Sequence, residues 1–161
     1  MSRKIEEAIE LRESGEYAAS IERWKRLIGE EPDNGFLHYQ CAWSHDAMGL
    51  ESEAVPYYES SIQLGLDDKE LQGAYLGLGS TYRTLGEYEK SKSVFEKGIG
   101  RFPENKALTV FYSMTLYNLN EHSKAMELLL TCIGESSQES TIEPYKKAIT
   151  FYASQLDVVW K

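Results

Sequence analysis

The chain has 161 residues, enough for one domain with a sizeable hydrophobic core, and 12% of its residues are aromatic. Its 26 acidic and 17 basic side chains give a formal charge of −9. This balance argues against nucleic acid and against an anionic membrane surface as partners, because both require a basic face.

The first residues are charged and lack the apolar core of a signal peptide, and no run of 18 apolar residues could span a membrane. The two cysteines, Cys41 and Cys132, are far apart and have no metal-like spacing. We therefore expect reduced thiols in the cytoplasm, with a disulfide between them as the less favoured alternative.

Glycine-like turn positions recur along the chain, at spacings of 34, 37 and 34 residues. They are Gly15, Gly49, Gly86 and Asn120, and asparagine is the best substitute for glycine where φ must be positive. Each turn lies between two small residues, one seven positions before it and one five positions after it. Those residues are Ala8 and Ser20, Ala42 and Ala54, Gly79 and Ser91, and Ser113 and Ala125. The pattern predicts a helix, a tight turn and a second helix in each copy.

The copies divide the chain into residues 1–34, 35–68, 72–105 and 106–135. After the fourth copy, the sequence predicts a further helix over residues 141–159, with a capping box formed by Ser140 and Glu143. The apolar face expected to dock consists of Tyr145, Ala148, Ile149, Tyr152 and Leu156. This helix would cover the open end of a helical stack, which gives nine helices in a single domain.

The third copy carries the fullest set of characteristic residues, namely Tyr75, Leu78, Gly79, Tyr82, Gly86, Tyr88, Phe95 and Pro103. Their spacing resembles the tetratricopeptide repeat (TPR), a helix pair that recurs about every 34 residues. The stretches QLGLDD, LGLGSTYRTLGEY and GRFPEN are similar to the subfamily called tetratricopeptide repeat group 5. The resemblance covers about residues 1–135. It implies an all-α, right-handed solenoid of four helix pairs that binds protein or peptide without catalysis or a cofactor.

Two glycines interrupt the first helix of the third copy, although glycine in a helix interior costs about 1 kcal/mol relative to alanine. Gly79 belongs to the series of small residues, so we expect it to lie where two helices pack closely. Gly77 has no equivalents of similar size. It either thins the wall of a groove or is neutral, and the sequence does not distinguish these two roles.

The residues His38, Cys41 and His45 share one helical face and are of types that bind metals. The same positions hold Tyr75, Leu78 and Tyr82 in the third copy, which favours a packed core over a metal site. No nucleophile-elbow, phosphate-loop, zinc-protease or calcium-loop motif occurs. We therefore expect neither catalysis nor a metal, with an enzyme as the minority alternative.

By resemblance to the family, the concave face is lined by particular positions of each first helix. Here these positions include Arg12, Phe36, Tyr39, Trp43, Leu76, Arg83, Val110, Met114 and Tyr117. We expect a peptide groove with Trp43 as anchor, in which Arg12 and Arg83 pair with carboxylates of the partner. The alternative is that the C-terminal helix or the curvature of the stack buries these residues.

The family's chaperone adaptors grip a C-terminal dicarboxylate with lysine, arginine and asparagine side chains. The matching positions are Ile5, Ile9, Gln40, Gly73 and Gly77, so that clamp is absent.

A second hypothesis for function is self-association. We expect Leu156, Val159 and Trp160 to form an apolar patch at one end of the chain. At the other end, the position of Ile5 and Ile9 in the repeat predicts that their side chains are exposed. Contacts between such patches would make a homodimer. The alternative is that the C-terminal segment folds back or frays.

Overall fold

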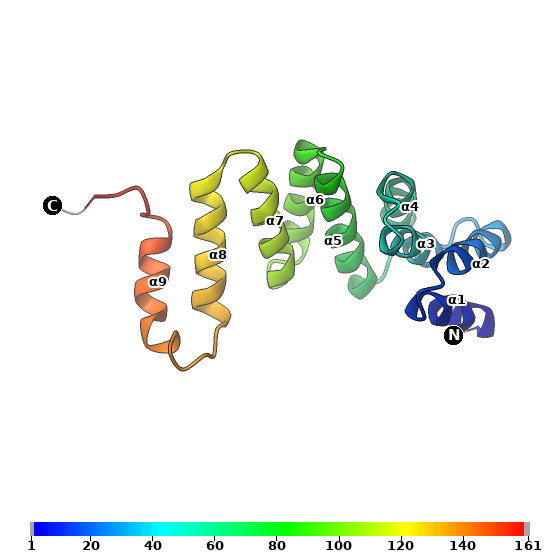
Figure 1. Cartoon of the computed structure of the whole chain (residues 1–161), viewed down its shortest axis with the longest axis horizontal. Helices are drawn as coiled ribbons and strands as arrows, with labels where there is room; N and C mark the ends of the chain where they lie inside the picture. The colour runs from blue at the N-terminus through cyan, green and yellow to red at the C-terminus, as the bar shows by residue number, and fades with distance from the viewer. Residues whose placement is uncertain (1, 160–161) are drawn as a thin grey trace. The chain divides into compact units, whose positions relative to one another are not determined.

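The computed structural model describes residues 2–159, and every regular element in this range is helical (Figure 1). Four helix pairs follow one another, which confirms the all-helical class predicted from the repeats. The helices are α1 (Arg3–Glu13), α2 (Tyr17–Glu30), α3 (Gly35–Ala47), α4 (Glu51–Leu64), α5 (Asp68–Thr84), α6 (Tyr88–Arg101), α7 (Lys106–Asn118), α8 (His122–Ser136) and α9 (Lys146–Ala153), with a 3₁₀ helix at Glu143–Tyr145.

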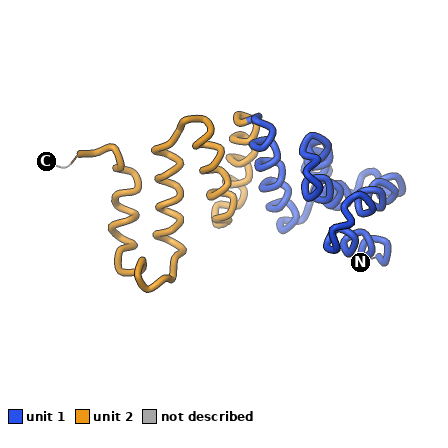
Figure 2. Tube along the Cα trace, viewed as in Figure 1, with its two compact units in different colours: residues 1–87 blue, residues 88–161 orange. Residues whose placement is uncertain are grey.

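The chain folds as two compact units, unit 1 (residues 1–87) and unit 2 (residues 88–161), coloured separately in Figure 2. Within unit 1, each of the helices α1 to α5 packs on its neighbour in sequence, and α3 also packs on α5. Within unit 2, α6 to α9 likewise pack on their neighbours. The division falls between α5 and α6, inside the third repeat copy.

The turns inside the repeat copies depend on a left-handed residue after the first helix. Gly15, Gly49 and Gly86 have φ values of 83°, 77° and 76°, and Asn120 has a φ of 62°. In the last of these turns the N–H of Glu121 donates to the carbonyl of Leu116 at 2.9 Å, which closes the end of α7. The turn series predicted from sequence is confirmed, including its asparagine member.

Small residues bring the helices of unit 1 close together. Ser20 is fully buried, and its hydroxyl donates to the Ala8 carbonyl at 2.8 Å. The Ser44 hydroxyl lies 3.0 Å from that of Ser20 and accepts a bond of 3.1 Å from the indole N–H of Trp24. Three helices are therefore joined by side chains short enough to let their backbones approach, and the hydroxyls of Ser20 and Ser44 and the indole N–H of Trp24 all have partners.

The core of unit 1 around this junction contains Ala8, Trp24, Leu27, Leu37 and Cys41. Ile5 and Ile9 pack against this cluster and are half buried. The prediction that these two side chains are exposed is therefore wrong, because they pack against core residues contributed by α2 and α3.

Gly77 gives room to a buried tyrosine. A Cβ atom at Gly77 would lie 2.5 Å from Cζ and from the hydroxyl oxygen of Tyr58, whose side chain is almost completely buried. One turn earlier on the same face of α5, a Cβ atom at Gly73 would lie 2.2 Å from the hydroxyl oxygen of Tyr39. The open question about Gly77 is thus answered, since it is required by the packing of α4 on α5.

The C-terminal helix is shorter than predicted, because α9 begins only at Lys146 and ends at Ala153. The capping box is wrong: Ile142 occupies the cap position of the 3₁₀ helix, and the Ser140 hydroxyl donates to Glu139. Pro144 disfavours the α conformation at the residue before it, which delays the start of the α-helix.

The docking face of α9 also differs from the prediction. Gly134 of α8 lies against Thr150 and Ile149, and Ala153 is buried. The glycine leaves a flat surface on α8, so the side of α9 with smaller residues fits there. Of the predicted face, Ile149 is half buried as expected, whereas Tyr145, Ala148, Tyr152 and Leu156 are exposed, and Trp160 lies outside the described residues.

We predict that Gly77→Ala destabilises the protein by about 1–3 kcal/mol, because the added methyl group displaces the buried ring of Tyr58. This loss outweighs the helix propensity that alanine normally adds. Urea unfolding followed by circular dichroism measures the change. Gly29→Ala is the matched control, because nothing lies within 4 Å of its Cβ position, and we expect it to be neutral or stabilising by up to about 1 kcal/mol. Equal effects of the two variants would contradict the assigned role of Gly77.

Candidate functional site

The residues predicted to line a groove occur in both units. In unit 1, Arg12 lies on α1, Phe36, Tyr39 and Trp43 on α3, and Leu76 and Arg83 on α5. In unit 2, Val110, Met114 and Tyr117 lie on α7.

Arg12 is turned into unit 1 and holds the Trp43 ring. Its guanidinium carbon lies 3.8 Å from the centre of that ring, and its Nη1 donates to the Gln40 side-chain oxygen at 2.6 Å. Only 7% of Arg12 is exposed, and burial lowers the pKa of its guanidinium. Arginine nevertheless keeps its charge at neutral pH, so the tryptophan ring has a buried cation stacked on it.

Trp43 itself faces solvent, with 45% of its surface exposed. Tyr39 packs at a tilt between Trp43 and Tyr58, with ring centres 6.1 Å and 6.3 Å away. Among the predicted groove residues, the fold brings Arg12, Tyr39 and Trp43 into contact, and we call these three the aromatic patch. The patch presents one large exposed ring on a support of packed side chains.

Hydrogen bonds to Asp46 fix the layer beneath the aromatic patch. The hydroxyls of Tyr58 and Thr81 each donate to the Asp46 carboxylate at 3.2 Å, from α4 and α5 respectively. Burial raises the pKa of Asp46, and burial also raises the pKa of Tyr58. Because three helices contribute to this layer, the position of the tyrosines depends on the tertiary packing of unit 1.

Sequence reasoning missed several residues of this arrangement. Gln40 holds Arg12, and Gly73 and Gly77 accommodate Tyr39 and Tyr58. One signal was present, since glycines four residues apart lie on one helical face and leave a smooth strip there. The side chains that fill this strip come from other helices, so the sequence of α5 does not identify them.

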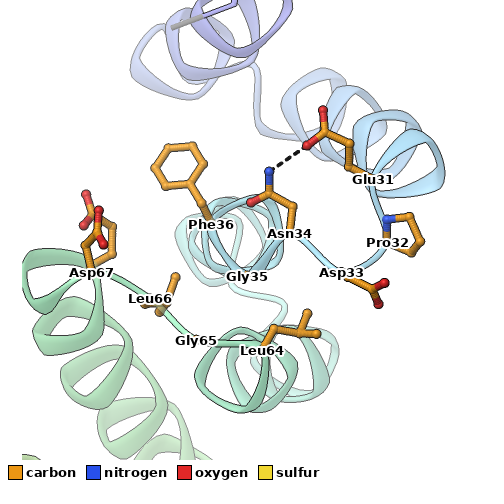
Figure 3. Close-up of a pocket in the computed structure, with 11 residues that line it drawn as sticks. Glu31, Pro32, Asp33, Asn34, Gly35, Phe36, Leu64, Gly65, Leu66 and Asp67 are labelled. Carbon is orange, nitrogen blue, oxygen red and sulfur yellow. Dashed lines mark hydrogen bonds between the residues drawn. The ribbon is translucent and has the colours of Figure 1, made fainter.

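Phe36 stands apart from the aromatic patch and lines a pocket of about 990 Å³ (Figure 3). The pocket lies at the N-terminal ends of α3 and α5, beside the ends of α2 and α4. Its lining includes four carboxylates and no basic side chain. We call it the acidic pocket, and its carboxylates are Glu31, Asp33, Asp67 and Glu70.

In unit 2, the three predicted residues are spaced by four and three positions along α7, which places them on one helical face. Tyr117 is 63% exposed and packs on the His122 ring at 4.9 Å, Met114 is 38% exposed, and Val110 is half buried. The helix α9 packs on α8 and leaves Tyr117 and Met114 open to solvent.

The histidine–cysteine face of α3 belongs mainly to the core. Cys41 and His45 are buried, which confirms the interpretation for these two, while His38 is half buried with Nε2 2.8 Å from the Pro32 carbonyl oxygen. The His45 ring stacks on Tyr57, and its Nδ1 donates to the Cys41 carbonyl at 2.8 Å. Burial raises the pKa of Cys41 to about 12, so its thiol stays protonated and unreactive.

Residues 2–159 contain no cluster of three or more histidine, cysteine, aspartate or glutamate side chains that could hold a metal ion. No helix of this range has the length and apolar character needed to cross a bilayer.

Comparison with known proteins supports the resemblance predicted from the repeats. The model of a family described as Tetratrico peptide repeat matches residues 35–156. The crystal structure of YrrB, described as a TPR protein with an unusual peptide-binding site, superposes with a TM-score of 0.72 at 14% identity, covering 96% of this chain and 77% of that one. The crystal structure of MamA superposes with a TM-score of 0.71 at 16% identity, covering 98% and 95%. At these identities the structures show a shared fold, and a comparison with curated protein sequences gives no match.

We predict that Arg12 and Trp43 are energetically coupled by about 0.5–2 kcal/mol, the range for a stacked cation and aromatic ring. A double-mutant cycle with Arg12→Met and Trp43→Leu, measured by urea unfolding, gives this coupling. The Arg12→Met variant alone costs a further 1–3 kcal/mol or so, because buried Gln40 loses its partner. Arg12→Lys keeps the charge but loses the planar stack. Its loss of unfolding free energy should therefore lie between zero and that of Arg12→Met. Additive effects of the two substitutions would show that the stack contributes nothing.

Proposed function

We propose, since the chain belongs to the tetratricopeptide repeat family, that it is a non-catalytic scaffold that binds a protein or peptide partner. The observation that carries this proposal is the aromatic patch of unit 1, in which Trp43 is exposed and yet fixed in place. Exposed apolar surface on a packed scaffold is typical of interaction sites.

The aromatic patch is suited to anchoring a partner because it is already ordered. Tryptophan and tyrosine bury a large area while losing few rotatable bonds, and such residues dominate binding energies at interfaces. Here Arg12 and Tyr39 hold the Trp43 ring before any partner arrives, which reduces the entropy lost on binding. Arg12 then serves the site by positioning Trp43, since its guanidinium is withdrawn from solvent.

Further contacts would come from the other predicted residues. On α5, Leu76 and Arg83 are half buried, and we propose that Arg83 gives a charged contact that orients the partner. On α7 of unit 2, Tyr117 and Met114 offer a second apolar surface. The peptide-binding site named for YrrB belongs to that protein, and it agrees with this use of the fold.

The proposed compartment is the cytoplasm. Cys41 and Cys132 are both free thiols and both buried, as suits a reducing environment.

The exposed side of α9 favours a second candidate function, self-association. Tyr145, Phe151, Tyr152, Leu156 and Val159 are all exposed on α9 and the residues around it. A second copy of the chain could cover this C-terminal patch and form a homodimer.

The scaffold proposal predicts that Trp43→Ala/Arg83→Glu loses its partner. A pull-down from the native host's lysate compares this variant with wild type, and circular dichroism confirms that its helicity is retained. Removing a central aromatic anchor should weaken binding by at least about 2 kcal/mol, roughly 30-fold. Met48→Ala/Arg26→Glu changes the same kinds of exposed side chain elsewhere in unit 1 and should keep the partner. Capture of the same proteins by wild type and by the Trp43 variant would place binding elsewhere.

The self-association proposal predicts that a chain ending at Asp157 has half the mass of the full chain in multi-angle light scattering, because it lacks the exposed Val158 and Val159. Phe151→Glu/Tyr152→Glu tests the remaining part of the C-terminal patch by adding charge to it. If all three forms have the same mass, the C-terminal patch has no role in assembly.

A further inference from the structure

The acidic pocket has a concave shape and unbalanced charge. Glu31 and Asp33 lie on one side and Asp67 on the other, with the Phe36 ring between them (Figure 3). Among the described residues none of the four carboxylates has a basic partner, and the Glu31 carboxylate accepts a 2.8 Å bond from the neutral Asn34 side chain. By contrast, Lys4 pairs with nearby Glu30 and Arg23 with Glu7. The pocket thus holds negative charge that the fold leaves uncompensated.

The floor of the acidic pocket is built by direct contact between two backbone segments. A Cβ atom at Gly35 would lie 2.4 Å from the Gly65 carbonyl oxygen and 3.0 Å from the Ser61 carbonyl oxygen. Gly65 has a φ of 100°, which few other residues adopt. The start of α3 and the end of α4 are therefore locked together, and the carboxylates above them are held on a rigid base.

The acidic pocket and the aromatic patch lie along the same face of α3. Phe36, Tyr39 and Trp43 follow one face of α3 at spacings of three and four residues. Glu70 of the pocket is close enough to Tyr39 to help raise the pKa of its hydroxyl, although burial is the main cause. A chain segment bound over Trp43 would therefore reach the pocket two helical turns away, a distance of about 10.5 Å along α3.

Charge is distributed unequally between the units. Residues 1–87 contain 17 acidic and 8 basic side chains, so unit 1 carries the whole formal charge of −9, whereas residues 88–161 contain nine of each. The field around the aromatic patch and the acidic pocket attracts cations and repels acidic segments. The negative charge of unit 1 therefore argues against a partner that presents carboxylates, which Arg12 and Arg83 taken alone had suggested.

The geometry also says which kind of cation fits. The carboxylates are spread around the pocket, and within residues 2–159 they form no cluster able to hold a metal ion. A lysine or arginine side chain has an apolar stem that would lie on Phe36 and a charged end that could reach a carboxylate on either side. We infer that the acidic pocket receives a lysine or arginine side chain of the same partner segment that places an apolar side chain on Trp43.

This inference rests on the proposed function and adds a spacing rule to it. An extended segment rises about 3.3 Å per residue, so the basic residue should lie about three positions from the apolar one. In a helical segment, which rises about 1.5 Å per residue, the spacing should be about seven. Peptides with an acidic residue at that place should bind worst.

The test is selection of binders from a random 12-residue peptide library displayed on phage, with the full chain as bait. The pocket variant is Asp33→Asn/Asp67→Asn/Glu70→Gln, which keeps the shapes of the side chains and removes three charges. No side-chain cap bond is lost, because Asp67 makes none at the start of α5. The control variant is Glu6→Gln/Glu22→Gln/Glu53→Gln, which removes three charges from exposed positions of unit 1 outside the pocket.

We expect peptides selected on wild type to pair an aromatic or apolar residue with lysine or arginine at the stated spacing. In fluorescence anisotropy, the pocket variant should bind these peptides about tenfold more weakly, because the one basic side chain of the peptide loses the attraction of three nearby carboxylates. The control variant should change affinity less than about twofold. Replacing the peptide's basic residue by glutamine should reproduce the loss on wild type and have little effect on the pocket variant.

Other results would overturn the inference in distinguishable ways. Peptides that depend on Trp43 but show no basic residue, or bind the pocket variant equally well, would leave the proposed function standing and remove the pocket from it. An equal loss of peptide affinity in the pocket and control variants would contradict a specific role of the pocket. It would indicate that the overall negative charge of unit 1 attracts basic peptides. Selection of no peptide above background would count against the proposed function itself and the inference with it.

Discussion

The close approach of neighbouring helices is the constraint on which the rest of this structure depends. In unit 1 this close approach occurs at Ser20 and Ser44, whose hydroxyl oxygens lie 3.0 Å apart. The Ser44 hydroxyl also accepts a hydrogen bond from the Trp24 indole. Unit 2 repeats the contact between Ser91 and Thr115 at 2.8 Å. Larger side chains at these places would push the helices apart, and hydroxyls without partners would be costly to bury. Each unit thus gains a regular helix array from a few small residues.

The candidate site uses the same principle of close approach. Glycines on α5 leave room for the hydroxyl ends of Tyr39 and Tyr58, and Tyr39 packs between Tyr58 and Trp43. Arg12 completes the support from α1. Trp43 is thus exposed to solvent and at the same time packed against Arg12 and Tyr39. The packing that builds the array therefore also prepares the surface for a partner.

The electrostatics of unit 1 separate two kinds of charge. Its buried cation, Arg12, is engaged by Gln40 and Trp43 inside the fold, while the carboxylates of the acidic pocket face outward without basic partners. An approaching segment would meet the negative charge first. The sign of the charge that a partner encounters is thus opposite to the one suggested by the arginines of the predicted groove.

The sequence alone determined the features that depend on local geometry. Positive φ at Gly15, Gly49, Gly86 and Asn120 follows from residue type, and the small residues at fixed distances from these turns mark where helices cross. The tertiary structure decided what depends on partners distant in sequence. It turned Arg12 inward, filled the space beside Gly77 with Tyr58, docked α9 by the side that fits Gly134, and gathered carboxylates from separate loops into one pocket. Periodicity gives the face of a helix, but the atoms that meet that face belong to other helices, and their fit is a property of the folded unit.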